Sequence, residues 1–175
     1  MDATPPPAEP DSRDWTVVVD EGCPECGYVP HDPALTAKRL RAAVPRWSVV
    51  LGRPDVAERP APRVWSPLEY ASHSRDLVRV LGERVAVMLE EEGAPFADYD
   101  GEAEAVRQRF WDNDPAEVDR QIAEHTEATV AVLARVRGED RERTGLRGDG
   151  RPFTVTELSR YLLHDVEHHL HDVGG

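Results

Sequence analysis

The sequence predicts an all-α fold, an up-down four-helix bundle that carries an N-terminal extension. Two capping boxes, Ser66 with Glu69 and Thr154 with Glu157, each precede a run of apolar residues and mark the start of a long helix. Apolar residues recur at three-and-four spacing through four segments of the chain. Four amphipathic helices cover one another's apolar stripes most simply in a bundle.

The chain is expected to form one domain, because 175 residues are too few for two domains that each bury a sizeable hydrophobic core. The bundle should occupy residues 32–175, and residues 1–31 should form a tail with a cysteine-containing extension. Within that segment, residues 1–14 are proline-rich and typical of a flexible tail. Residues 15–20 predict a short strand or an extended arm, and a turn-rich stretch follows over residues 21–30.

The first two bundle helices have clear start signals. The first should begin at Asp32, an N-cap that precedes Pro33 at the first helical position. Pro45 falls inside its apolar stripe, so we expect a kink or a break there. A proline-rich connection over residues 53–64 then leads to the Ser66 box, which starts the second helix.

The last two helices are separated by polar segments. Residues 93–112 are irregular in pattern, with a short helix expected over residues 102–110. The third helix opens at Asp114, an N-cap followed by proline. Residues 138–152 are typical of a polar, glycine-containing loop. The fourth helix should extend from the Thr154 box to about residue 173.

Composition and charge exclude several classes of partner. A formal charge of −13 and a pI near 4.9 repel nucleic acid and anionic lipid. The apolar runs are too short to cross a bilayer, and the first ten residues lack the pattern of a secretory signal. We therefore expect a cytoplasmic protein without nucleic acid or membrane as a partner.

Four of the seven histidines lie in the last twelve residues. His164 and His168 are four residues apart, so on a helix their side chains emerge about 5 to 6 Å apart and one cation could bridge them. A third ligand must come from another element, and His73 on the second helix is the leading candidate. Three protein ligands leave coordination positions open, as in a catalytic metal site. The spacing alone is also typical of a solvated helix face.

Two segments carry a resemblance to a known family. Residues 65–76 (WSPLEYASHSRD) and 160–169 (RYLLHDVEHH) resemble the second-helix and fourth-helix signatures of the DinB-like superfamily, which includes mycothiol-dependent maleylpyruvate isomerases. The resemblance extends over residues 33–173. It implies a four-helix bundle that binds a divalent metal through one second-helix histidine and a pair of fourth-helix residues four apart. Carried over position by position, these ligands are His73, His164 and His168.

Neighbouring residues provide alternatives for the site. His169 and His171 line the metal site or replace a ligand if the register of the fourth helix shifts by one or two residues, and otherwise they are polar surface. Asp76 and Asp165 either orient ligand imidazoles or are solvated carboxylates. His125 and Tyr161 are the last candidates. Each either lines the wall of a pocket or packs in the core.

Cys23 and Cys26 form a separate candidate. The string Cys-Pro-Glu-Cys-Gly-Tyr predicts a tight turn that resembles half of a zinc knuckle, and no second cysteine pair exists to complete it. His31 is one further ligand candidate. A redox-sensitive thiol pair without metal is the alternative.

The resemblance implies a thiol-dependent transferase or isomerase. The metal, most simply zinc with nickel, iron or manganese as alternatives, would bind a low-molecular-weight thiol as the thiolate, which attacks an electrophilic substrate. Lys38 is the only lysine beside many arginines, a codon signature of a GC-rich genome that favours mycothiol over bacillithiol or glutathione as this thiol. The alternatives are a metal-dependent hydrolase and a non-catalytic metal-binding or ligand-binding stress-response module. The expected partners are therefore a small thiol and an electrophile, and a homodimer is left open.

Overall fold

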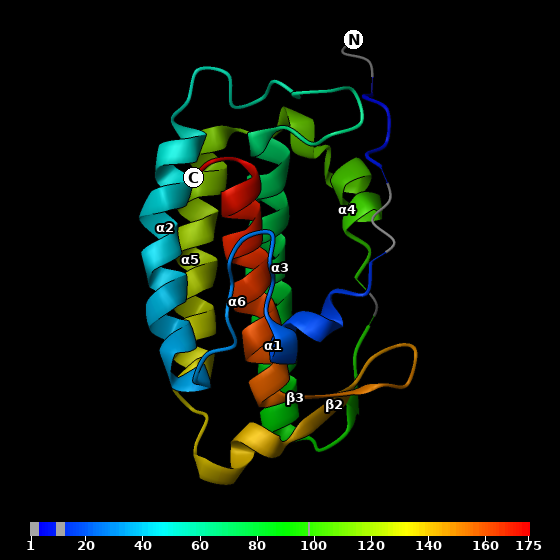
Figure 1. The fold of residues 1–175 in the computed structure, drawn as a ribbon, viewed down its shortest axis with the longest axis vertical. Coiled ribbons are helices and arrows are strands. Elements are labelled where there is room, and N and C mark those ends of the chain that lie inside the picture. Colours follow the sequence, from blue (N-terminus) through cyan, green and yellow to red (C-terminus); the bar gives the residue numbers. More distant parts are fainter. Residues whose placement is uncertain (1–3, 10–12, 98) are drawn as a thin grey trace.

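Four long helices form the body of the protein (Figure 1). The structure is a computed structural model, and it describes residues 4–9, 13–97 and 99–175. The bundle consists of α2 (Thr36–Leu51), α3 (Pro67–Glu90), α5 (Pro115–Leu133) and α6 (Val155–Asp172). Two short helices, α1 (Val18–Glu21) and α4 (Gly101–Gln108), lie outside it. The predicted four-helix bundle is confirmed in these elements.

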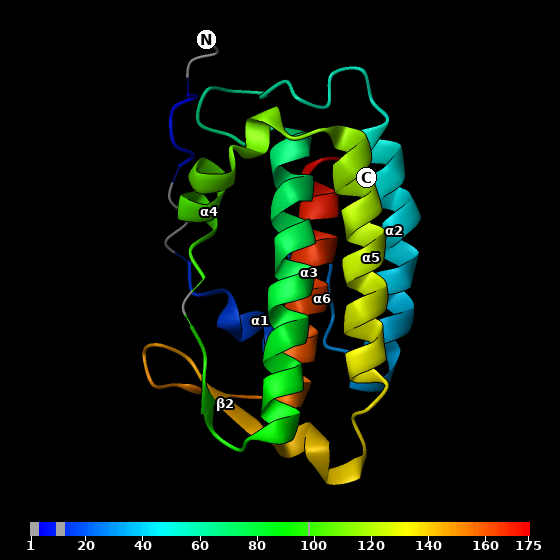
Figure 2. The same ribbon diagram turned by 180° about the vertical axis from the view of Figure 1, so that it is seen from behind.

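The helices are not connected in simple up-down order. α3 packs mainly against α5 and α6, and α2 packs against the same two helices, so that α2 and α3 lie on a diagonal. Figures 1 and 2 show α3 and α5 running in the same direction, because the connection between them passes α4 and returns to the end of the bundle where α3 begins. The up-down part of the prediction is therefore not confirmed.

Both capping boxes are present where the sequence predicts them. The Ser66 hydroxyl accepts a hydrogen bond from the backbone amide of Glu69. The Glu69 carboxylate accepts one from the backbone amide of Ser66 at 2.8 Å. Thr154 and Glu157 make the same reciprocal pair at the start of α6. Each box satisfies amide groups that the first helical turn leaves without a partner, which fixes where the two helices begin.

The prediction of a purely α-helical fold needs a correction. A three-stranded sheet lies at one end of the bundle, in the order β1 (Ala94–Pro95), β2 (Thr144–Leu146) and β3 (Pro152–Thr154). β1 pairs with β2 in parallel and β2 pairs with β3 antiparallel. The segment predicted as a polar loop therefore contains two strands, preceded by a 3-10 helix, Gly138–Glu142. The buried side chain of Phe153 in β3 belongs to the bundle core, so packing holds this strand against the helices.

The extended arm predicted over residues 15–20 was wrong. This segment forms a 3-10 turn, Trp15–Val17, followed by α1, and Asp14 caps it by accepting the amide of Thr16. Its β-branched residues favour extended structure, but tertiary packing decides the conformation. Val18 and Val19 are buried in the core, and α1 lies against α6.

The first bundle helix differs in a smaller way. Asp32 caps a 3-10 turn, Pro33–Leu35, and α2 follows it without a break. α2 is a single helix through Pro45, so the predicted split does not occur.

Among the described residues, no helix is both long enough and apolar enough to cross a bilayer.

Candidate metal centres

Helix α6 carries two interleaved pairs of potential metal ligands. His164 and His168 are four residues apart and share one face of the helix, and Asp165 and His169 form a second pair rotated by roughly 100°. The side chains of the first pair meet the N-terminal extension, where Cys23 lies 3.5 Å from His168. The second pair meets His73 of α3.

One group of potential ligands consists of His73, Asp165 and His169. Each offers one atom, and the three atoms lie within 4.8 Å of one another. The Asp165 Oδ1 atom is 3.9 Å from His73 Nε2 and 3.3 Å from His169 Nε2. A tetrahedral zinc ion with bonds of about 2.1 Å separates its ligand atoms by roughly 3.4 Å. The spacing in this group is therefore close to that of a three-ligand metal site.

The electrostatics of this group fit a cation. His73 is only 9% exposed, its Nδ1 atom has no hydrogen-bond partner, and burial lowers the pKa of the ring well below its usual value. The buried Oδ1 atom of Asp165 also lacks a hydrogen bond, and burial raises the pKa of this carboxyl. A buried carboxylate needs a partner of opposite charge, and neutral imidazoles offer lone pairs to a metal. The donor set therefore suits a divalent ion.

A cavity of about 720 Å³ opens onto this group. Its wall includes Trp65, whose ring lies 5.2 Å from that of His73, and Tyr99 at 5.9 Å. Gly101 also lines it, and a Cβ atom there would lie 2.8 Å from Cε1 of His73. The backbone of α4 thus approaches the His73 ring as closely as only glycine permits.

The three ligands predicted from the sequence are divided between two groups. His73 lies with Asp165 and His169. The sequence suggested His169 as a replacement ligand if the register shifts, and Asp165 as a residue that orients a ligand imidazole. His164 and His168 lie with Cys23 and Cys26 in a second group, again with one atom of each residue within 4.8 Å of the others.

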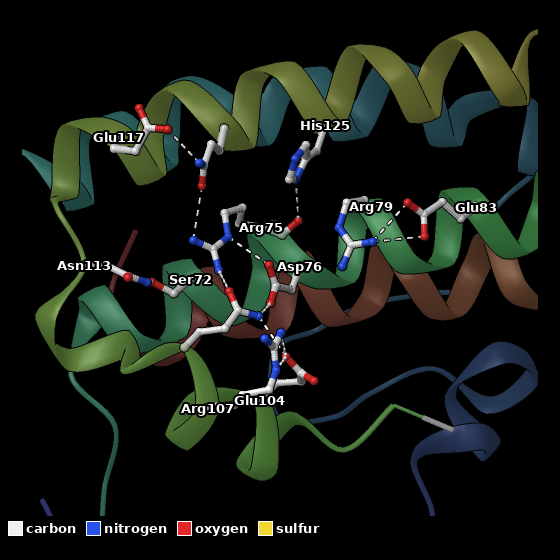
Figure 3. Close-up of polar contacts among 12 residues, drawn as sticks. Ser72, Arg75, Asp76, Arg79, Glu83, Glu104, Arg107, Asn113, Glu117 and His125 are labelled. Carbon is white, nitrogen blue, oxygen red and sulfur yellow. Dashed lines mark hydrogen bonds and ion pairs between the residues drawn. The ribbon is translucent and has the colours of Figure 1, made fainter. Parts of the chain in front are cut away.

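Two other candidates belong to a polar network between α3, α4 and α5 (Figure 3). The carboxylate of Asp76 accepts hydrogen bonds from Arg75 Nε at 2.9 Å and from Gln108 Nε2 at 2.6 Å. His125 Nδ1 lies 3.0 Å from the backbone carbonyl oxygen of Arg75. Asp76 therefore orients a guanidinium and an amide, and His125 joins α5 to α3.

The remaining candidates lie away from the large cavity. Tyr161 lines a different cavity of about 540 Å³, where its ring contacts Phe153, and burial raises its pKa. His171 is exposed near the end of α6. His31, the further ligand suggested for the cysteines, bonds instead to Tyr28 and Thr36.

Several residues of the large cavity were missed by the sequence prediction, among them Trp15, Tyr99 and Gly101. Trp15 and Tyr99 line it from segments predicted as an extended arm and as an irregular connection, where no periodicity indicated their direction. Gly101 lies just before the short helix predicted over residues 102–110, and the structure shows that Asp100 caps this helix, α4. Neither feature indicates a contact with His73.

Comparisons with known proteins agree with the fold. Residues 37–173 match the family model described as the DinB superfamily. The chain belongs to the DinB superfamily. The resemblance inferred from the second-helix and fourth-helix segments is thereby confirmed, and the extension with Cys23 and Cys26 lies outside the matched region of this DinB-superfamily chain.

One solved structure shares the architecture of this DinB-superfamily protein. YfiT from Bacillus subtilis is described as a probable metal-dependent hydrolase with an unusual four-helix bundle topology. It superposes with a TM-score of 0.71 over 81% of this chain and 85% of its own, at 16% sequence identity. No curated protein matches the sequence.

Proposed function

We propose that the protein is a divalent-metal-dependent transferase or isomerase, in which a metal held by His73, Asp165 and His169 activates a low-molecular-weight thiol. The single observation that carries this proposal is the three-ligand group at the wall of a 720 Å³ cavity. Two imidazoles and one carboxylate suit zinc, with nickel, iron or manganese as alternatives. When bound, such an ion lowers the pKa of a coordinated thiol or water, so that it is deprotonated near neutral pH.

The protein contributes the orientation of the ligands. His73 is held between the Trp65 ring and the α4 backbone at Gly101, which fixes the direction of its imidazole. His169 contacts the carboxylate of Asp172 through Nδ1 at 3.0 Å, which leaves Nε2 facing Asp165. A histidine that ligates a metal commonly uses its second nitrogen in this way.

The cavity itself lacks an obvious nucleophile. Among the described residues that line it, none is serine, threonine, cysteine or lysine. Tyr99 lines the cavity, but its hydroxyl is buried without a hydrogen-bond partner, and burial raises its pKa, so this group stays protonated and is not a nucleophile at neutral pH. We therefore infer that the attacking group enters with a ligand, which a small thiol can do. The size of the cavity suits such a ligand together with an electrophile.

The thiol that we propose is mycothiol. The choice follows from the arginine-rich composition and from the thiol used by the isomerases whose helix signatures the sequence resembles. Metal-dependent hydrolysis is the second candidate, because the superposed YfiT structure is described as a probable hydrolase of that kind. In that case water would take the position proposed for the thiol sulfur.

The test measures turnover of a generic electrophile by the metal-loaded protein, with mycothiol and without any thiol. We expect turnover that depends on mycothiol and that falls by at least about 100-fold in His169→Ala. His171→Ala is the matched control, because this histidine is on the same helix but is exposed. Equal turnover without thiol on a hydrolysable substrate would replace the proposal by hydrolysis. Turnover unaffected by His169→Ala would overturn both.

A further inference from the structure

We propose that Cys23, Cys26, His164 and His168 bind a zinc ion in a closed Cys2His2 site that fastens the N-terminal extension to α6. The four residues come from segments more than a hundred positions apart, yet one atom of each lies within 4.8 Å of the others. This site is separate from the one proposed for catalysis. It uses an adjacent face of α6, rotated by roughly 100°, and its two cysteines lie outside the DinB match. His164 and His168 border the same cavity as the catalytic group.

The distances fit tetrahedral zinc. Cys23 Sγ lies 3.5 Å from His168 Nδ1. With a Zn–S bond of about 2.3 Å and a Zn–N bond of about 2.1 Å, tetrahedral ligands are separated by roughly 3.6 Å. Both cysteines are free thiols, so both sulfurs are available as ligands.

The backbone around the cysteines forms a defined turn. The Gly27 amide donates to the Cys23 carbonyl, and the Cys23 amide donates to the Tyr28 carbonyl, each at 2.9 Å. Gly22 and Gly27 have φ values of 78° and 74°, which only glycine adopts without strain. A Cβ atom on Gly22 would lie 2.6 Å from the Tyr28 carbonyl oxygen. The two thiols are therefore presented by a preformed turn with the two-residue spacing of structural zinc sites.

An unpartnered buried nitrogen points independently to a ligand. His164 is 3% exposed, and its Nε2 atom has no hydrogen-bond partner. Leaving such an atom unsatisfied destabilises the fold. Coordination to zinc would satisfy it, since a neutral imidazole donates its lone pair to the ion.

The surroundings suit a buried and electrically neutral centre. Two thiolates balance the charge of Zn²⁺, and binding releases the two thiol protons to solvent. The ring of Trp15 lies 5.5 Å from that of His164 and 4.9 Å from that of His168, and it shields the site. Asp172 approaches His168 Nε2 at 3.6 Å, on the side of the ring opposite the thiol, where a carboxylate can orient a ligand imidazole.

The deciding experiment loads the metal-free full chain with Co²⁺ and records the thiolate-to-cobalt charge-transfer band in the near ultraviolet. We expect the band in the wild type, a Co²⁺ affinity lower by about 10-fold or more in His168→Ala, and an unchanged band and affinity in His169→Ala. These adjacent histidines form a matched pair, because the second belongs to the other group. Retention in His169→Ala also separates this test from the proposed catalytic function.

A second measurement protects the test against a variant that fails to fold. In the wild type with zinc, both thiols should resist alkylation until a chelator is added. Cys26→Ser, at a partly exposed position, should bind one zinc ion fewer per chain. Equal alkylation with and without chelator would overturn the proposal. A Cys23–Cys26 disulfide in freshly purified protein, or a cobalt spectrum without the band while both thiols are reduced, would do the same.

Discussion

At the scale of single residues, the closest constraint on the proposed catalytic site is the contact between Gly101 and His73. A methyl group at position 101 would lie 2.8 Å from the ring carbon Cε1, so the imidazole would have to move. A ligand displaced in this way binds metal less tightly.

We predict that Gly101→Ala lowers metal affinity at this site by about 10-fold to 100-fold, the range seen when the support of a ligand is lost. Competition with a chromophoric chelator measures the affinity. Gly52→Ala is the control, because a Cβ there meets nothing closer than 3.4 Å. An affinity equal to that of the control would contradict the prediction.

His31 provides a prediction of pH dependence at a residue that belongs to neither metal group. Burial, together with Arg39 and Arg160, lowers the pKa of this ring to about 4. The unfolded chain then binds the proton first, so the stabilisation is complete above about pH 6.5 and is lost as the pH falls toward 4.

We predict that the wild type loses about 1 to 2 kcal/mol more unfolding free energy between pH 7 and pH 5 than His31→Asn does. Denaturant unfolding at the two pH values measures the difference, with zinc present in every sample. The other titratable groups are the same in the two proteins, so their contributions to the unfolding free energy largely cancel in the comparison. Parallel losses in the two proteins would show that His31 is not the group responsible.

The sequence predicted the residue types of the metal groups better than their grouping. His73 and the histidines of α6 were identified from spacing and from the family signatures. Spacing cannot distinguish His164 with His168 from Asp165 with His169, because the two pairs differ only by a rotation of roughly 100° about the helix axis. The partners on α3 and on the cysteine turn are tertiary contacts that have no local signal.

At the scale of helices and strands, the two capping boxes differ in burial, although their sequences are alike. Ser66 is fully buried, and Glu69 beside it is also buried and paired with Arg59. Thr154 is partly exposed. Water can therefore replace the lost hydroxyl more easily at the start of α6.

We predict that Ser66→Ala lowers the unfolding free energy by about 2 kcal/mol and Thr154→Ala by about 1 kcal/mol. Chemical denaturation of both variants beside the wild type gives the comparison. If Thr154→Ala costs as much as Ser66→Ala, burial does not decide the contribution of the cap.

The elements that the sequence predicted correctly are those whose signals are local. Capping boxes and N-terminal prolines mark the starts of α3, α5 and α6. The helical conformation of residues 15–20 depends on burying Val18 and Val19, and the short strands depend on pairing between distant segments. Such non-local contacts override the intrinsic preference of a few residues.

At the scale of the whole molecule, the N-terminal extension is part of the core. Val18, Val19 and Tyr28 belong to the same apolar cluster as the bundle helices. The proposed zinc site would join this extension to α6 through coordination of one ion by residues of both segments. Removing zinc should therefore lower the stability of the whole fold.

We predict that a strong zinc chelator lowers the unfolding temperature of the wild type by on the order of 10 °C, as expected for an ion present at about a thousand times its Kd. Differential scanning calorimetry measures the change. Cys26→Ser should respond by only a few degrees, because the cysteine site is already lost. A shift of the same size in both proteins would place the stabilising ion elsewhere.

The two faces of α6 differ in chemical softness. On one face the imidazoles meet the sulfurs of the cysteine turn, which favours zinc or cuprous ions, and on the other an imidazole stands beside a carboxylate, which also accepts manganese or ferrous ions. A six-residue stretch of α6, residues 164–169, thus contributes to two sites with different selectivity. Under our assignments, growth conditions that change the supply of one metal would alter the reactive centre and leave the fastening ion in place.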